Sequence, residues 1–244
     1  LKKIFEDNPI PSMCGRICMK HCETACSLSI QGEAVAIRWL KRFVADSIDD
    51  YKTALELERS EPTGNKIAVI GAGPSGLSMA YFLTLKGHKV TVFDSLPGGG
   101  GMMRIGPPAY RLPIEAIDKD VSYIASLGVE FRFNTTVGKD ISFEDIQKDY
   151  DATYLGIGTT VSRSTKVDNI DKAHLALPFL QQNKVGSQTK VGKQIIVIGG
   201  GNVAMDVARE ALRLQHIQYP DQKVTTSTVS LEDWDEMPAT EDEI

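Results

Sequence analysis

Two segments of the chain have the glycine spacing of a phosphate-binding loop. The first consists of Gly71, Ala72, Gly73, Pro74, Ser75 and Gly76, between an apolar run and a segment with a helical pattern. In such a loop the first glycine allows a tight turn, the second lets the backbone approach a pyrophosphate, and the third lets helix and strand pack closely. Free N–H groups at the start of the helix favour the phosphates. The alternative interpretation is a tight turn without a ligand.

An acidic residue stands where dinucleotide sites bind a ribose. The apolar run 89–93 ends at Asp94, 23 residues after Gly71. A carboxylate at that place accepts hydrogen bonds from ribose hydroxyls. Strand, glycine loop, helix, strand and acid therefore occur in the order of a unit that binds a dinucleotide.

The second glycine segment repeats this pattern after the apolar run 194–198. It has Gly199 and Gly201, Ala204 takes the place of the third glycine, and the other candidate contacts are Asn202 and Val203. A turn without a ligand is again the alternative. Two dinucleotide sites in one chain allow hydride transfer between two cofactors, which favours the binding interpretation for both.

The residues beyond the second unit indicate which nicotinamide dinucleotide binds there. NADP sites usually hold the 2′-phosphate with an arginine, whereas NAD sites place an acid on the 2′-hydroxyl. Here Glu232 follows the expected strand 223–229, and no lysine or arginine follows Lys223. We therefore predict that the second site prefers NADH to NADPH.

The cysteines are concentrated near the start of the chain. They are Cys14, Cys18, Cys22 and Cys26, with three residues between neighbours, and no other cysteine occurs. In a cytosolic chain such a cluster indicates metal or redox work rather than disulfides. The spacing matches neither a zinc ribbon nor the bacterial ferredoxin run. An iron–sulfur cluster, parts of two clusters, zinc, and unreactive structural thiols are the interpretations that the residues allow.

The pattern of apolar residues indicates the elements that must position these groups. Short apolar runs without alternation are typical of parallel strands covered on both faces. The strand 152–156 leads into Gly158, which we include among the cofactor-binding candidates. The stretch 97–113, rich in glycine and proline, is expected to be a loop. In full, we expect strands at 66–70, 89–93, 129–133, 152–156, 194–198 and 223–229, and helices at 33–48, 75–86, 114–127 and 202–214.

Further motifs resemble one family of flavoproteins. The stretch from Asn8 to Cys18, followed by Cys22 and Cys26, is similar to the N-terminal cluster motif of the glutamate synthase small-subunit family. Its kin include the N-terminal part of dihydropyrimidine dehydrogenase and the flavin subunits of ferredoxin-linked NAD(P)H oxidoreductases. The resemblance covers nearly the whole chain, including residues 35–38, 71–76, 100–106, 110–113, 199–206 and 236–239.

This resemblance implies a set of cofactors and contacts. It implies FAD at the first glycine loop, with contacts from Asp94, Gly101, Met102 and Arg111, and a nicotinamide dinucleotide at the second loop. It also implies [4Fe–4S] clusters held by the four cysteines together with further cysteines upstream. In relatives that use NADPH, an arginine pair stands where this chain has Leu231 and Glu232, which agrees with the predicted preference for NADH.

The predicted fold class is α/β, with a helical segment before two Rossmann-like units. The implied domains are a helical iron–sulfur segment and linker (1–64), the first part of an FAD-binding domain (65–190) and the first part of an NAD(P)-binding domain (191–244). Because the second unit has barely begun when the sequence reaches Ile244, we expect a piece of a larger polypeptide.

The bulk composition limits the function classes. A net charge of −5 gives no reason to expect a nucleic-acid surface. No apolar run approaches the ~20 residues that span a bilayer, so no membrane insertion is expected. The first residues lack the apolar core of a signal peptide, which predicts a cytoplasmic protein.

These features predict an FAD-dependent NAD(P)H oxidoreductase. Electrons would pass from NADH through FAD and iron–sulfur clusters to an electron-accepting subunit or a ferredoxin-like partner, within a hetero-oligomer. No catalytic acid or base is predicted, because hydride transfer needs only two rings held in contact. The alternatives are a non-catalytic iron–sulfur and nucleotide-binding scaffold, and a zinc-bound regulatory module.

Overall fold

The computed structural model describes residues 1–161, 170–184, 186 and 189–229. The chain divides into two compact units. The first comprises Leu1–Arg104 and Tyr110–Thr159, and the second comprises Ile105–Ala109 and the residues from Thr160 onward. Glu232 lies outside the described residues, and so does the stretch 236–239 that contributed to the family resemblance.

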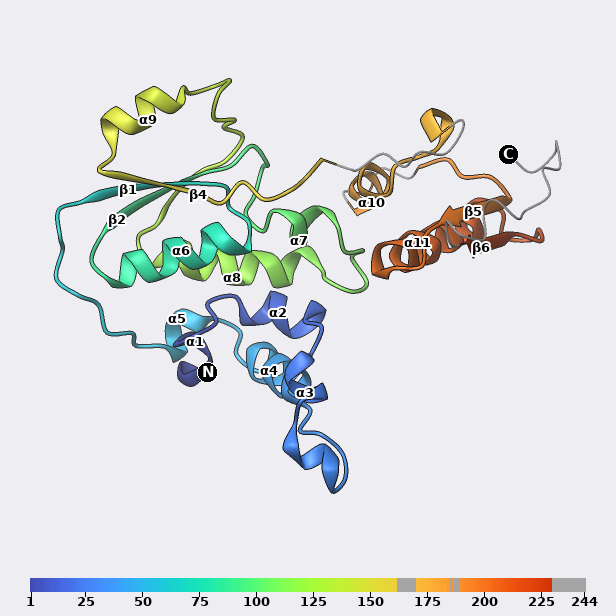
Figure 1. The fold of residues 1–244 in the computed structure, drawn as a ribbon, viewed down its shortest axis with the longest axis horizontal. Coiled ribbons are helices and arrows are strands. Elements are labelled where there is room, and N and C mark those ends of the chain that lie inside the picture. Colours follow the sequence, from blue (N-terminus) through green and yellow to red (C-terminus); the bar gives the residue numbers. More distant parts are fainter. Residues whose placement is uncertain (162–169, 185, 187–188, 230–244) are drawn as a thin grey trace. The chain divides into compact units, whose positions relative to one another are not determined.

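A parallel sheet forms the centre of the first unit (Figure 1). Its order is β3-β2-β1-β4, and all neighbouring pairs are parallel. Because both faces are covered, the central strands β1 and β2 are apolar along almost their whole length. The bounds are β1 Lys66–Ile70, β2 Lys89–Phe93, β3 Glu130–Arg132 and β4 Ala152–Leu155.

Helices cover the two faces of this sheet. The helices α6 (Pro74–Leu85) and α8 (Ile114–Ser126) lie on one face, and α9 (Phe143–Asp149) lies on the other (Figure 1). Alternate residues of each strand point to opposite faces. The two resulting cores are therefore built from Ile67, Val69, Val90 and Val92 on the α6 and α8 side, and from Ala68, Ile70 and Phe93 on the α9 side.

The N-terminal helices continue the core beneath α6 and α8. The Phe5 ring meets the Tyr51 and Tyr123 rings edge-on, with centroids 5.2 Å and 5.0 Å away, and the Tyr81 hydroxyl donates to the Phe5 carbonyl oxygen at 2.9 Å. The helical segment and the sheet thus share one hydrophobic core, and the predicted boundary after residue 64 stays a proposal. The helices are α1 Lys2–Phe5, α2 Pro11–Ile17, α3 His21–Thr24, the 3₁₀ turn η1 Ser27–Ile30, α4 Ile37–Asp46 and α5 Tyr51–Ala54.

The helix predicted for 33–48 is shorter in the structure. It begins at Ile37, because Ala36 has a non-helical backbone conformation (φ −75°, ψ 60°). The Glu23 carboxylate accepts a hydrogen bond of 2.8 Å from the Arg38 backbone N–H. A residue 15 positions away therefore satisfies one of the free N–H groups at the start of this helix.

Within its described residues, the second unit contains a strand–helix–strand unit preceded by further helical segments. Strands β5 (Gln194–Ile198) and β6 (Thr225–Val229) are parallel, and α11 (Asn202–Gln218) connects them. Helix α11 continues four residues beyond the predicted end at Leu214. The Gln215 amide is buried and donates to the carbonyl oxygens of Gly192, Lys193 and Thr225. This polar residue of α11 is therefore part of the protein interior.

Several short elements lie where the sequence pattern predicted none. Within the predicted loop 97–113 lies α7 (Met102–Ile105), and α10 (Ala176–Lys184) and the 3₁₀ turn η2 (Ile170–Lys172) precede β5. Across the part of the chain that the structure describes, no helix combines the length and apolar character needed to cross a bilayer.

Candidate dinucleotide and iron–sulfur sites

The three glycines of the first loop have separate structural roles. Gly71 has φ of 102°, and a Cβ there would lie 2.3 Å from the Gly156 carbonyl oxygen. A Cβ on Gly76 would lie 1.8 Å from the Gly71 carbonyl oxygen, so this glycine allows α6 to pack against β1. At Gly73 the nearest atom would be the Cα of Gly101, 3.9 Å away. A side chain at the first or third glycine would therefore collide with the backbone, whereas the space beside the second glycine, Gly73, is open.

The start of α6 is oriented as a phosphate site requires. Gly73 is the residue before the helix and Pro74 is its first residue, a position where proline loses no hydrogen bond. The Gly71 N–H donates to the Phe93 carbonyl oxygen at 2.7 Å, which holds the loop at the carboxyl ends of β1 and β2. Ligands of open α/β sheets bind at this edge.

Asp94 follows β2 and contacts the glycine loop directly. Its Oδ2 accepts a hydrogen bond from the Ala72 N–H at 2.6 Å, and its Oδ1 accepts one from the Leu96 N–H at 2.8 Å. The carboxylate is therefore placed beside the loop, as the sequence predicted, and it also holds the loop in shape. Hydrogen bonds to a ribose use the remaining acceptor capacity of the two oxygens and stay a prediction.

A further glycine-rich segment, the loop 98–101, lies against the first glycine loop. The Gly100 N–H donates to the Ala72 carbonyl oxygen at 2.7 Å, and a Cβ on Gly101 would lie 2.8 Å from the Cα of Gly73. Gly101 has φ of 51°, and Met102 follows it at the start of α7 with 36% of its surface exposed. Gly101, one of the residues that the resemblance implied, is thus brought to the first loop, whereas a role for Met102 stays a prediction.

Arg111 and Gly158 belong to the same unit, but their roles stay predictions. Arg111 is half-buried. Gly158 follows β4 with φ of 65°, and a Cβ there would meet no atom within 4 Å. Sequence reasoning missed Tyr154, near the carboxyl end of β4, whose hydroxyl lies 2.7 Å from the Ser75 hydroxyl in the first turn of α6. A polar residue at the carboxyl end of a strand beside β1 was the available signal.

The second glycine loop repeats the geometry with one change. Gly199 has φ of 127°, and its N–H donates to the Val229 carbonyl oxygen at 2.7 Å, as Gly71 does to Phe93. A Cβ on Gly199 would lie 3.4 Å from the Cβ of Ala204, so alanine fits at the third position. Gly201 precedes α11, and no atom lies within 4 Å of the Cβ that it lacks. Asn202 is the first residue of α11, and Val203 beside it is 57% exposed.

The four cysteines occupy different environments. Cys14 lies on α2, Cys18 follows that helix, Cys22 lies on α3 and Cys26 precedes η1. All four are free thiols. Among the residues that the structure describes, no three histidine, cysteine, aspartate or glutamate side chains are close enough together to hold a metal ion.

The chemistry of two of these sulfur atoms fits a cluster ligand. The Cys18 Sγ accepts a hydrogen bond of 3.4 Å from the Lys20 backbone N–H. The backbone amide of Val35, followed in importance by that of Leu28, lowers the pKa of the Cys26 thiol. Thiolates are the form that ligates iron, and N–H groups directed at sulfur favour that form.

Cys14 differs from the other cysteines. It packs against the buried core, and burial raises the pKa of its thiol. A thiol that is protonated and packed among apolar side chains is a poorer metal ligand than an exposed thiolate. The surroundings of the sulfur atoms therefore favour Cys18 and Cys26 over Cys14.

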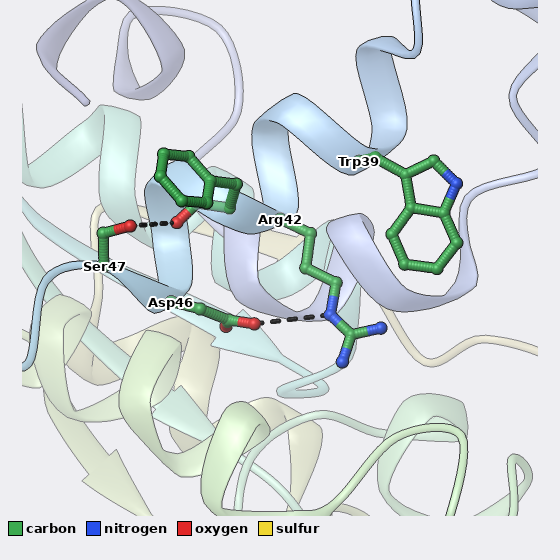
Figure 2. Close-up of a pocket in the computed structure, with 5 residues that line it drawn as sticks. Trp39, Arg42, Asp46 and Ser47 are labelled. Atoms are coloured by element: carbon green, nitrogen blue, oxygen red, sulfur yellow. Dashed lines mark hydrogen bonds and ion pairs between the residues drawn. The ribbon is translucent and has the colours of Figure 1, made fainter.

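A shallow pocket lies on the surface of α4 (Figure 2). The Arg42 guanidinium contacts the Asp46 carboxylate at 3.3 Å, and the Ser47 hydroxyl donates to the Phe43 carbonyl oxygen at 2.7 Å. The Trp39 ring lies beneath two guanidinium groups, of Arg38 and Arg42. All the lining residues come from one helix and its end, so this hollow cannot enclose a dinucleotide.

Comparison with known proteins agrees with these features. Residues 65–232 match the family described as pyridine nucleotide-disulphide oxidoreductase, and residues 1–53 match dihydropyrimidine dehydrogenase domain II with its 4Fe-4S cluster. The chain is 38% identical over 218 residues to the NADPH-Fe(3+) oxidoreductase subunit beta of Geobacter sulfurreducens, covering 86% of this chain and 32% of that protein. It is 36% identical to the glutamate synthase [NADPH] small chain of Escherichia coli, covering 85% of this chain and 47% of that protein.

A solved structure has the same fold over part of the chain. FprA from Mycobacterium tuberculosis, as its His57Gln mutant, superposes with a TM-score of 0.53 and 26% identity, covering 61% of this chain and 36% of FprA. The chain spans less than half the length of the two curated relatives named above.

The fold, the two glycine loops and the cysteine segment define an iron–sulfur oxidoreductase with dinucleotide-binding units. The chain belongs to the pyridine nucleotide-disulphide oxidoreductase family, within the group that resembles the glutamate synthase small subunit and the N-terminal region of dihydropyrimidine dehydrogenase. The predicted family and the predicted α/β fold class are thereby confirmed. The family name refers to disulfide chemistry, but this chain has no cysteine after Cys26.

Proposed function

We propose that the protein is an FAD-dependent NAD(P)H oxidoreductase that transfers electrons from NADH to an iron–sulfur cluster and then to a partner subunit. The observation that carries the proposal is the shared core of the first unit, in which the cysteine-bearing helices pack directly on the helices that follow the first glycine loop. An electron acceptor bound by the cysteines would thus belong to the same compact unit as the proposed FAD site. The relatives are named as subunits or a small chain, which supports a hetero-oligomer.

The first glycine loop is the proposed FAD site. The open side of Gly73 admits a pyrophosphate, and the N–H groups at the start of α6 bind it. The Gly101 backbone lies beside this space, and Met102, the next residue, is a proposed contact. When bound, FAD accepts an electron pair from a nicotinamide and releases electrons singly, as iron–sulfur clusters require.

The proposed ligands of a [4Fe–4S] cluster are Cys18, Cys22 and Cys26, and Cys14 is the least suited of the four. The Cys18 sulfur accepts a backbone N–H, backbone amides lower the pKa of the Cys26 thiol, and Cys22 is exposed. The protein is proposed to be cytoplasmic, where nicotinamide dinucleotides and reduced thiols are maintained.

Visible absorbance of the full-length protein under anaerobic conditions tests the proposed function. Flavin absorbance near ~450 nm is expected to bleach on addition of NADH, followed by loss of the broad iron–sulfur absorbance. Flavin that binds but does not bleach would support the scaffold alternative. A protein that has neither flavin nor cluster absorbance but contains zinc would support the regulatory alternative.

The preference for NADH over NADPH is a separate prediction. Strand β6 ends at Val229, and Glu232 follows it by three residues in the sequence. Glu232 is expected to repel a 2′-phosphate and to accept hydrogen bonds from a 2′-hydroxyl. We expect NADH to bind about tenfold more tightly than NADPH, a difference of ~1.4 kcal/mol. Both named relatives carry NADPH in their names, which makes this measurement informative.

Titration of flavin bleaching with each nucleotide measures the preference. Replacement Glu232→Arg is expected to reverse it, because a guanidinium attracts the 2′-phosphate. Glu241→Arg, in the same terminal stretch, introduces the same charge change and is expected to leave the preference unaltered. Tighter binding of NADPH by the wild-type protein would contradict the prediction.

A further inference from the structure

Four consecutive residues of α8 contact both proposed cofactor sites of the first unit. Ile117 contacts the glycine-rich loop 98–101 directly, and Asp118 reaches this loop through Arg104. Lys119 and Asp120 contact the cysteine-bearing helical segment. We call these four residues the α8 link. They lie on one helix, so a movement of α8 displaces both sites together.

On the cysteine side, Asp120 holds the first turn of α2. Its side chain is fully buried, Oδ2 accepts from the Met13 N–H at 2.8 Å, and Oδ1 accepts from the Ser12 N–H at 3.2 Å. These N–H groups have no partner within their own helix, because they belong to its first turn. Burying a carboxylate without partners is costly. The two backbone hydrogen bonds offset this cost only when the first turn of α2 lies in this position, so the buried carboxylate fixes the position of α2.

Lys119 makes a second connection to the same segment. Its ammonium group donates to the Ala45 carbonyl oxygen at 2.7 Å, in the last turn of α4, and to the Ile48 carbonyl oxygen, just beyond that helix. The ammonium also lies 4.6 Å from the centroid of the Tyr51 ring. The start of α2 and the end of α4, two helices that pack on each other, are thus held by adjacent residues of α8.

On the side of the proposed FAD site, Ile117 holds the glycine-rich loop 98–101 directly and Asp118 holds it indirectly. A Cβ on Gly100 would lie 2.7 Å from the Ile117 Cγ2, so the loop backbone rests on this side chain. Asp118 pairs with Arg104, whose Nε donates to the Gly99 carbonyl oxygen at 2.6 Å. Gly100 in turn donates to Ala72 in the first glycine loop.

We propose that the α8 link sets the distance between the flavin and the cysteine-bound cluster, and that Asp120 is the positioning residue that holds α2 in place for electron transfer. This inference rests on the proposed function. The two hydrogen bonds of Asp120 come from the backbone of α2, so Asp120 acts through that backbone. Electron transfer depends on the separation and orientation of donor and acceptor, so a small displacement of α2 is expected to slow it strongly.

The test compares Asp120→Ala and Asp120→Asn with the wild type in the full-length, cofactor-loaded protein. Stopped-flow absorbance follows two steps after mixing with NADH: bleaching of the flavin and reduction of the cluster. In Asp120→Ala we expect flavin bleaching within about twofold of the wild type and cluster reduction slowed about 10- to 100-fold. Asp120→Asn keeps one carbonyl acceptor and is expected to show a smaller effect.

A second measurement does not depend on electron flow. Amide hydrogen exchange of Ser12 and Met13 is expected to accelerate at least about tenfold in Asp120→Ala, because both N–H groups lose their acceptor. Glu115→Gln removes an exposed carboxylate from the same helix and is the matched control, with no change expected in either measurement. Lys119→Met provides an independent variant of the link, with the same direction of effect expected on cluster reduction.

Two results would overturn the inference. One is cluster reduction at the wild-type rate in both Asp120→Ala and Lys119→Met, and the other is unchanged exchange at Ser12 and Met13. A wild-type protein whose flavin is not bleached by NADH would instead refute the proposed function alone. In that case chemical reduction of the flavin replaces NADH, and the rate of cluster reduction still tests the α8 link.

Discussion

Replacing Gly76 by alanine is expected to abolish FAD binding and to destabilise the first unit. The new Cβ would lie 1.8 Å from the Gly71 carbonyl oxygen and 3.2 Å from the Val69 Cγ1. The first contact is with backbone, so no rotamer change relieves it, and α6 must move away from β1. Overpacking of this kind costs about 3 kcal/mol. The melting temperature is expected to fall by about 10 °C, as measured by circular dichroism.

Gly73→Ala is the matched substitution in the same loop. Its φ of −73° suits any residue, and the nearest atom to the new Cβ would be 3.9 Å away. The melting temperature of the flavin-free protein is therefore expected to stay within about 1 °C of the wild type. The methyl group enters the space proposed for the pyrophosphate, so FAD affinity should fall at least about tenfold. Wild-type FAD affinity in Gly73→Ala would show that the flavin does not bind at this loop.

Replacing Cys26 by alanine is expected to remove the cluster while leaving the flavin in place. The Val35 and Leu28 amides favour the thiolate of Cys26, which is the form that ligates iron. Iron and acid-labile sulfide content should fall to background, and electron delivery to the partner should fall at least about 100-fold. Bleaching of the flavin by NADH should continue at the wild-type rate, because hydride transfer precedes the cluster. Metal analysis and anaerobic absorbance measure the two effects.

Cys14→Ala separates ligation from packing within the same cysteine cluster. The Cys14 side chain packs against the core, and burial raises the pKa of its thiol. The substitution is expected to retain the iron and to lower the free energy of unfolding by about 1 kcal/mol, the effect of removing a small apolar group. Loss of iron in Cys14→Ala together with retention in Cys26→Ala would reverse the proposed assignment of ligands.

The elements next to the first glycine loop were predictable to within about one residue from local pattern. The strands β1 and β2 and the helix α6 between them lie almost where the apolar runs placed them. Parallel strands buried on both faces require continuous apolar runs, and a phosphate loop requires glycines at fixed spacing. Such requirements act over a few neighbouring residues, so they are visible in the sequence.

Elements held by distant partners were predicted less well. Helix α9 has few apolar residues, and its place is set by packing on Ala68, Ile70 and Phe93 from two strands. The predicted end of α11 at Leu214 is four residues too early, and the Gln215 amide just beyond it is buried against three carbonyl groups. Local propensity does not report which polar groups find partners in the interior.

The candidate sites divide in the same way. Residue types and spacing alone identified the two glycine loops, Asp94 and the four cysteines as the chemically competent groups, since each motif depends on short-range geometry. The fold was needed to place Asp94 on the Ala72 N–H, Tyr154 on Ser75 and Asp120 on the start of α2. These contacts join residues 22, 79 and 107 positions apart, and they form only when the sheet and helices bring distant segments together. The distinction between Cys14 and Cys26 is of this second kind, because burial and backbone N–H groups, and not the identity of the residue, set the pKa of each thiol.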